Sequence, residues 1–183
     1  MMFRTLSRSV ATGIALLTPV AAFAQEAAEA AAAVPNPGNN AWMMTATVLV
    51  MLMILPGLAL FYGGLTRSKN MLSTMTQIGA TASLAMLVWV MWGYSTAFGP
   101  EGNAFFSWGN LFLSQVTTDS TAATFSDEVI SEYVFVSFQM TFAAITAALV
   151  LGATVERLKF SAAMLFTAIW LTIVYFPIAH MVW

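Results

Sequence analysis

Four long segments without any Asp, Glu, Lys or Arg constrain this chain more than any other feature. They are residues 41–65, 71–98, 133–155 and 160–183. As a helix rising about 1.5 Å per residue, each is long enough to cross a hydrocarbon core of about 30 Å. Backbone polar groups inside lipid must pair within their own segment, and the alternating polarity of barrel strands is absent. The sequence therefore predicts an all-α, polytopic membrane protein with four transmembrane helices.

The composition excludes several other classes of protein. The chain is 60% hydrophobic and only 8% charged, with no cysteine and a single histidine, whereas a soluble domain carries about 25% charged residues. Disulfides, thiolate metal ligands and a dedicated metal site are therefore not expected. Six basic and eight acidic residues give no basic face for nucleic acid. No phosphate-binding glycine loop or nucleophile–base pair is present, so we expect neither an enzyme nor a cofactor.

The N-terminal segment has the pattern of a secretory signal. Arg4 and Arg8 precede a modest apolar stretch, residues 10–22, and small residues then stand at the two positions that a signal peptidase reads. A first transmembrane helix is the alternative, but this apolar stretch is too short to span a bilayer. We predict a cleaved signal peptide over residues 1–24. The Ala-rich, then Pro/Gly/Asn-rich residues 25–40 are expected to form a flexible leader outside the membrane.

The distribution of charge predicts the orientation of the helices. Beyond the signal segment the basic residues lie only in the loops after the first and third helices: Arg67, Lys69, Arg157 and Lys159. The loop over residues 99–132 has no basic residue and five acidic ones. The positive-inside rule puts the basic loops in the cytoplasm and the acidic loop outside. A mature N-terminus outside the membrane agrees with cleavage of the signal peptide.

Two loops and two prolines have local interpretations. FFSWGNLFL, residues 105–113, is either a vestibule over a pore or an ordinary anchor at the membrane interface. ERLKF reads as a cytoplasmic turn in which Glu156 and Lys159 can form an exposed ion pair. Pro56 and Pro177 are expected to interrupt the first and fourth helices.

Two pairs of residues are candidate functional groups. Phe138 and Phe142 are four apart in SFQMTFAAIT, so they share a helix face. They are either packing residues or rings that line a pore and attract a cation. His180 and Trp183 are three apart near the outer end of the fourth helix. His180 is a functional candidate or an interfacial anchor, and Trp183 is a cation-binding face or a belt residue.

Five motifs in order carry a family resemblance. FYGGLTRSKN, WGYSTAFG, FQMTFAAIT, GATVERLKFSA and YFPIAHMVW, spread over residues 40–183, together resemble the ammonium transporter (Amt/MEP/Rh) family on its bacterial Amt branch. The resemblance implies eleven membrane helices in two inverted five-helix repeats, assembled as a homotrimer with one pore per subunit. Four of those helices are expected here, in residues 41–183. We therefore expect an N-terminal part of a longer transporter, inactive by itself.

The resemblance also implies a mechanism and its residues. Ammonium is recruited at an outer site of aromatic rings, loses its proton, and ammonia crosses a hydrophobic pore. Phe142 resembles the outer-gate phenylalanine, Phe138 its companion, and Trp183 the tryptophan whose face binds ammonium. Tyr62 matches a tyrosine near the inner end of the pore. His180 is not assigned to the pore, because the family's paired pore histidines lie on the fifth and tenth helices.

The remaining expectations concern location and partners. The resemblance implies a bacterial inner membrane protein with a periplasmic mature N-terminus, contacts with the lipid bilayer, and a PII-type regulatory protein on the cytoplasmic face. The competing interpretation is a short membrane subunit, derived from the same fold, that works in interaction or sensing.

Overall fold

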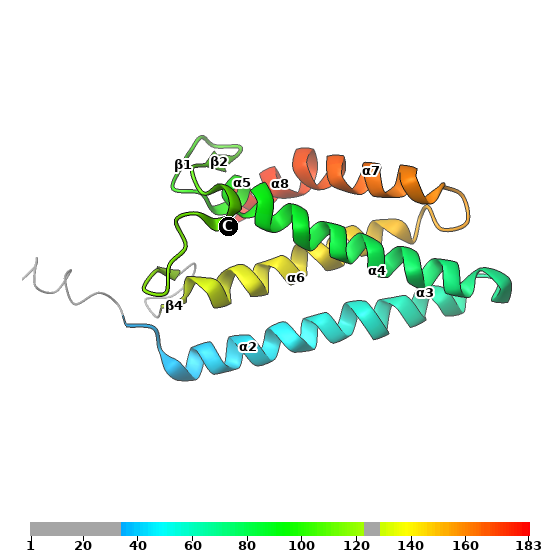
Figure 1. The fold of residues 1–183 in the computed structure, drawn as a ribbon, viewed down its shortest axis with the longest axis horizontal. Helices are drawn as coiled ribbons and strands as arrows, with labels where there is room; N and C mark the ends of the chain where they lie inside the picture. The colour runs from blue at the N-terminus through cyan, green and yellow to red at the C-terminus, as the bar shows by residue number, and fades with distance from the viewer. Residues whose placement is uncertain (1–33, 123–128) are drawn as a thin grey trace, which may run out of the picture.

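Four apolar helical spans run side by side along the long axis of the molecule (Figure 1). The computed structural model describes residues 34–122 and 129–183. Within these residues the spans are Pro37–Leu65, Ser68–Phe98, Glu132–Leu151 and Phe160–Val182, each long and apolar enough to cross a membrane. The prediction of four transmembrane helices is confirmed. The predicted signal peptide, residues 1–24, lies outside the described residues, as does most of the predicted leader.

The first span begins earlier than the predicted residue 41. It consists of α2 (Pro37–Leu52), a π-helical segment η1 (Met53–Leu58) and α3 (Ala59–Leu65). The side chain of Asn36 caps α2 by accepting hydrogen bonds from the backbone N–H groups of Gly38 (2.9 Å) and Asn39 (3.2 Å). Together with a proline at the first helical position, this cap extends the helix into the predicted leader.

The second and fourth spans each contain a π-helical segment in their C-terminal half. The second comprises the 3₁₀ turn η2 (Ser68–Asn70), α4 (Met71–Val88), η3 (Trp89–Gly93) and α5 (Tyr94–Phe98). The fourth comprises α7 (Phe160–Trp170), η5 (Leu171–Tyr175) and α8 (Phe176–Val182). A hydrogen bond joins the two π-helical segments, because the indole N–H of Trp92 donates to the hydroxyl of Thr172 at 3.0 Å. Pro56 lies inside η1 and Pro177 just after η5, so both predicted interruptions coincide with a local change of helix type.

The third span, α6 (Glu132–Leu151), ends before the predicted residue 155. The residues after it form tight turns, in which the N–H of Thr154 bonds the Leu151 carbonyl at 2.8 Å. Glu156 has a φ of 65°, which a right-handed helix cannot contain. Inside α6, four small residues are buried, and small residues permit close contact between membrane helices: Ala143, Ala144, Ala147 and Ala148.

The second and third spans are joined by residues 99–131, which we call the outer loop after its predicted orientation. Two small β-ribbons form most of it. β1 (Glu101–Gly102) pairs antiparallel with β2 (Ser107–Trp108), and β3 (Thr121–Ala122) with β4 (Ile130–Ser131); the 3₁₀ turn η4 (Leu111–Leu113) lies between them. The buried hydroxyl of Ser107 accepts from the Gly99 N–H at 2.7 Å and donates to the Ser95 carbonyl at 2.8 Å. The first ribbon is thus fixed to the end of α5, where helix carbonyls need partners.

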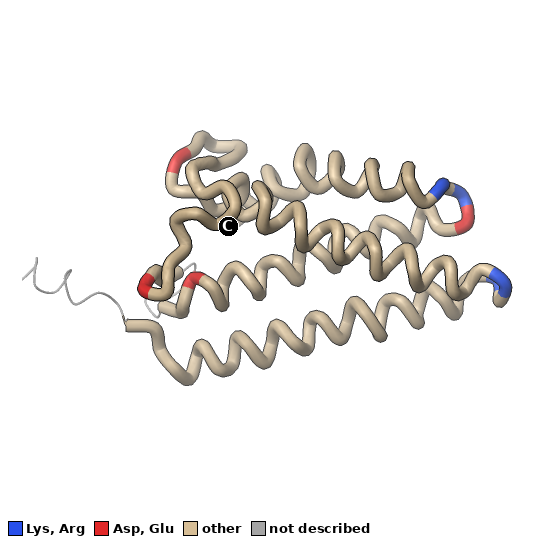
Figure 2. Tube along the Cα trace, viewed as in Figure 1, with Lys and Arg blue, Asp and Glu red and all other residues tan. Residues whose placement is uncertain are grey.

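Charge is segregated along the bundle. Figure 2 shows the described Lys and Arg residues at one end and acidic residues of the outer loop at the other. Glu156 is the acidic residue that shares the basic end. This is the asymmetry on which the predicted orientation depends.

Candidate functional site

Two phenyl rings of α6, those of Phe138 and Phe142, contact each other. The ring centroids of Phe138 and Phe142 are 5.0 Å apart and their planes meet at 66°, an edge-on contact. Both side chains are half-buried. A spacing of four residues brings side chains onto one helix face, so the predicted pairing of these rings is observed.

Trp183 joins this pair from a different span. Its ring centroid is 6.5 Å from that of Phe142, with the two planes at 89°. Trp183 follows α8 and remains 41% exposed. Three residues that the sequence singled out, Phe138, Phe142 and Trp183, therefore form one continuous series of ring contacts.

Sequence reasoning missed a fourth ring, that of Phe98. Phe98 ends α5, and its ring stacks on Trp183 with centroids 6.1 Å apart and planes at 19°. Phe98 also stacks on Tyr94 at 5.7 Å and meets the edge of Phe135 at 5.0 Å. The signal was present in WGYSTAF, where Tyr94 and Phe98 have the same four-residue spacing as Phe138 and Phe142.

We call Phe98, Phe138, Phe142 and Trp183 the outer aromatic cluster. The ring of Phe98 lies nearly parallel to the Trp183 indole, which remains 41% exposed and so accessible to a ligand. Indole and phenyl faces carry negative potential and attract cations. The cluster lies at the acidic end of the bundle, where the hydroxyl of Tyr94 donates to Glu132 at 2.6 Å. A surface of negative charge raises the local concentration of cations.

His180 lies three residues before Trp183 of the outer aromatic cluster, and its imidazole contacts two backbone carbonyls. Its Nδ1 is 2.9 Å from the carbonyl oxygen of Ala97 in α5. Its Nε2 is 2.9 Å from the carbonyl oxygen of Asn103, in the turn between β1 and β2. The half-buried imidazole therefore bridges two backbone segments of the second span and the outer loop.

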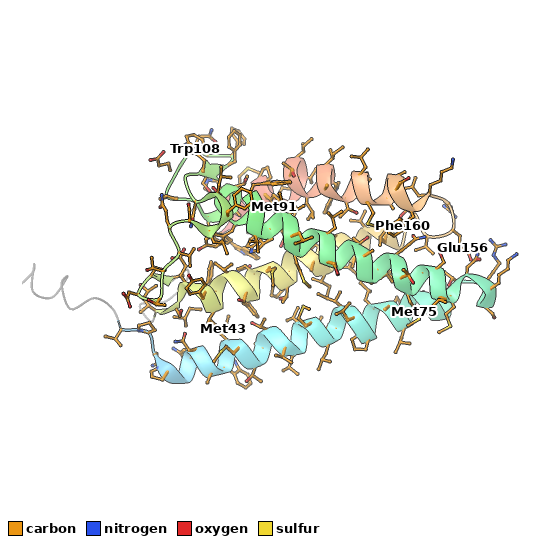
Figure 3. The ribbon with its side chains drawn as sticks, in the orientation of Figure 1. Met43, Met75, Met91, Trp108, Glu156 and Phe160 are labelled. Atoms are coloured by element: carbon orange, nitrogen blue, oxygen red, sulfur yellow. The ribbon has the colours of Figure 1, made fainter. Side chains whose placement is uncertain are left out.

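Tyr62 lies at the other end of the bundle and does not join the cluster. Its hydroxyl donates to the Leu149 carbonyl at 3.2 Å. Its ring covers Gly152 so closely that an added Cβ there would lie 2.5 Å from Cζ. Tyr62 also lines an open cavity of about 450 Å³, with Arg67 and Glu156 among the other lining residues. Figure 3 shows Glu156 at the end of the bundle opposite Trp108 of the outer loop.

Glu156 connects the two basic loops at this end. Its carboxylate accepts from Asn70 Nδ2 at 2.7 Å and lies 3.1 Å from Arg67 Nη2. Hydrogen bonds from Asn70 and then Arg67 lower the pKa of the Glu156 carboxyl. The predicted ion pair with Lys159 is therefore wrong, because the left-handed turn at Glu156 directs its carboxylate to the preceding basic loop instead.

The described part of the chain contains no cluster of side chains that could hold a metal ion. No group of three or more His, Cys, Asp or Glu side chains comes together over residues 34–122 and 129–183. What the described arrangement offers is a set of aromatic faces at one end and a charged cavity at the other.

The chain matches a family model over residues 41–183, and the family is described as the Ammonium Transporter Family. It is 42% identical over 148 residues to a putative ammonium transporter of Methanothermobacter thermautotrophicus, covering 81% of this chain and 36% of that protein. An ammonium transporter of Bacillus subtilis is 42% identical over 149 residues, covering 80% of this chain and 35% of that protein.

Solved structures give the same result. The crystal structure of Candida albicans Mep2 is similar with a TM-score of 0.69 and 37% identity, covering 80% of this chain and 31% of that one. Saccharomyces cerevisiae Mep2 gives a TM-score of 0.66 at 32% identity, with 80% and 33% covered. The chain thus spans about a third of the length of the relatives that it matches.

Proposed function

This chain belongs to the ammonium transporter family, and from that premise we propose that it supplies the outer recruitment site and part of the pore wall of a transporter that conducts ammonium as ammonia. The observation that carries the proposal is the outer aromatic cluster. It combines ring contacts among three spans, an exposed indole and an acidic surround.

Recruitment is a matter of replacing water around a small cation. Ammonium approaches the exposed indole of Trp183. The ring of Phe142 stands perpendicular to this indole. A cation over an aromatic face gains about 0.5 kcal/mol at an exposed site and about 2 kcal/mol when desolvated. The gain increases as water is removed, so the half-buried rings favour a cation that sheds part of its hydration shell.

Passage beyond the rings requires loss of charge. Phe138 and Phe142 are apolar and contact each other at 5.0 Å, so they oppose entry of a hydrated ion. A bare cation in an apolar wall is costly, whereas neutral ammonia is not. We therefore propose that ammonium transfers its proton to water next to Phe142, leaving hydronium on the exposed side, and that ammonia moves toward the end of the bundle marked by Tyr62.

The finer expectations on assembly belong to the same proposal. The basic loops with Arg67 and Arg157 would face the cytoplasm and the acidic loop the periplasm of a bacterial inner membrane. The cavity lined by Tyr62, Arg67 and Glu156 is then the candidate contact for a PII-type regulatory protein. The apolar residues exposed on α2 and α3, among them Leu49 and Phe61, support burial against lipid or other subunits of a homotrimer.

A chimaera tests the proposal, because the chain spans a third of its relatives. Residues 41–183 would replace the matched segment of the Bacillus subtilis relative in a host without other ammonium transporters. We expect saturable methylammonium uptake. The substitution W183L should raise the half-saturation concentration by about three- to thirtyfold, the loss of one cation–π contact.

The matched control is W42L, which removes a tryptophan that is 68% exposed on α2, a helix that contributes no ring to the cluster. It should leave the half-saturation concentration unchanged. Equal kinetics for W183L and the unsubstituted chimaera would refute the recruitment role. A chimaera that reaches the membrane without uptake, while the chain copurifies with a partner protein, would favour the interaction or sensing subunit.

A further inference from the structure

We infer that His180 is a positioning residue for Trp183: a hydrogen bond from its Nδ1–H to the Ala97 carbonyl holds the indole against Phe98. The role goes beyond the proposed recruitment site and rests on it, because a correctly placed indole matters only if that indole binds the cation.

The first step is that two contacts join the same two short segments. His180 bonds the carbonyl of Ala97 at 2.9 Å, and Trp183 stacks on Phe98, the next residue along α5. His180 and Trp183 are three apart at the end of α8, so their side chains share one helix face. The backbone N–H of Trp183 still bonds the Ala179 carbonyl at 3.0 Å, which keeps both residues in helical register.

The second step is that the imidazole itself is held in place. Nε2 lies 2.9 Å from the Asn103 carbonyl in the turn between β1 and β2. That turn is ordered by the side chain of Asn103, which accepts from the N–H groups of Phe105 at 2.8 Å and Phe106 at 3.2 Å. The imidazole thus lies between two backbone carbonyls, which limit the rotation of the end of α8 relative to α5.

The third step is to ask which of the two contacts positions Trp183. A carbonyl oxygen only accepts, and a neutral imidazole carries a single N–H. The contact with Ala97 is directly connected to Phe98 by one peptide bond, whereas Asn103 belongs to the outer ribbon. We place this N–H on Nδ1, where it donates to the Ala97 carbonyl next to Phe98; Nε2 then carries a lone pair and makes no hydrogen bond to Asn103.

Amide substitutions separate the two contacts. In H180N the amide NH₂ stands near the place of Nδ1 and can still donate to Ala97. In H180Q it stands near the place of Nε2 and can donate to Asn103 instead. H180L removes both ring nitrogens at similar size. All three variants would be made in the full chain, reconstituted in lipid nanodiscs, and in the chimaera described above.

The first readout does not depend on transport. With fluorotryptophan incorporated, fluorine NMR gives one resonance per tryptophan, and W183F identifies that of Trp183. We expect this resonance to shift and broaden in H180L and H180Q and to stay in place in H180N. Loss of folding in H180L leaves the comparison between H180N and H180Q intact.

The second readout is kinetic. In the chimaera, H180Q should raise the half-saturation concentration for methylammonium by about two- to tenfold, as expected for loss of one hydrogen bond. The maximal uptake rate per transporter should not change, and H180N should retain the original value.

Either of two results would overturn the inference: a Trp183 resonance that is unaffected in H180L, or identical behaviour of H180N and H180Q. Failure of the proposed function looks different. In that case the Trp183 resonance responds to the histidine variants as expected, but methylammonium neither shifts this resonance nor enters cells through the chimaera.

Discussion

The indole of Trp183 lies parallel to the phenyl ring of Phe98, with centroids 6.1 Å apart and planes inclined by 19°. The contact joins the outer ends of the second and fourth spans. The orientation of the indole therefore depends on a ring from another span.

Replacing the stacking ring should therefore impair recruitment. In the chimaera, F98L keeps an apolar side chain but removes the aromatic partner of Trp183. Aromatic pairs contribute about 0.5–1.5 kcal/mol beyond burial, so we expect the half-saturation concentration for methylammonium to rise by about two- to tenfold. F98Y preserves the ring and should retain most of the affinity.

F105L provides the control for this experiment, because Phe105 is 62% exposed in the outer loop and is not one of the rings of the cluster. Uptake kinetics of F105L should match those of the parent chimaera. An F98L variant with unaltered half-saturation would mean that the stack does not shape the recruitment site.

The packing of η3 against the start of α8 depends on the absence of a side chain at Gly93. A Cβ built there would lie 2.5 Å from Cζ of Phe176, a fully buried ring. We expect G93A to lower the free energy of unfolding by about 1–3 kcal/mol, the usual cost of overpacking. Unfolding in sodium dodecyl sulfate, followed by circular dichroism in mixed micelles, measures this loss.

Gly79 on the same span supplies a matched control. Among the described residues, none lies within 4 Å of a Cβ added at Gly79, so G79A should leave stability unchanged or slightly raise it. The double variant G93A/F176L should recover part of the loss, since a smaller side chain relieves the clash. Equal stability of G93A and G79A would contradict the packing argument.

The spans and the pair of rings on α6 were predictable because their signals are local. A charge-free run of more than twenty residues predicts a membrane helix without any tertiary information, and a four-residue spacing predicts a shared helix face. The helix start at Pro37 was also readable. Asn36 followed by proline is a capping signal, although composition alone assigned these residues to a leader.

The relationships between spans were not predictable from one sequence. The stack of Trp183 on Phe98 requires that α8 pack against α5, a contact between elements far apart in the sequence. The partner of Glu156 was missed for a similar reason. Its carboxylate turns toward Arg67 in another loop because of a left-handed backbone conformation, whereas sequence proximity suggested Lys159.

Tyr62 and Gly152 form a second close contact that can be tested by substitution. A Cβ at Gly152 would lie 2.5 Å from the Tyr62 hydroxyl, so G152A should displace the ring and break its bond to the Leu149 carbonyl. We expect a loss of about 1–3 kcal/mol in the free energy of unfolding. Y62F removes only the hydrogen bond and should cost about 0.5–1.5 kcal/mol.

The control is G64A on the same helix, where no described atom lies within 4 Å of the added Cβ. Its unfolding in sodium dodecyl sulfate should resemble that of the unsubstituted chain. If Y62F lost as much stability as G152A, the hydroxyl bond rather than the close ring contact would dominate at this end of the bundle.

The cluster around Glu156 should make stability depend on pH in the acidic range. Hydrogen bonds from Asn70 and Arg67 lower the pKa of the Glu156 carboxyl below its ordinary value of 4.5. A depressed folded-state pKa adds stability that is fully present above the unfolded value and is lost as the pH falls through the folded value. The unfolding temperature should therefore decrease as the pH is lowered below about 4.5.

In E156Q this part of the pH dependence should be absent, and the unfolding temperature near neutral pH should be lower because the bond to Arg67 loses its charge. D119N is the matched control, since Asp119 is an exposed acidic residue of the outer loop, and it should keep the acidic fall. A fall of the same size in E156Q and the unsubstituted chain would show that other carboxylates, and not Glu156, cause it.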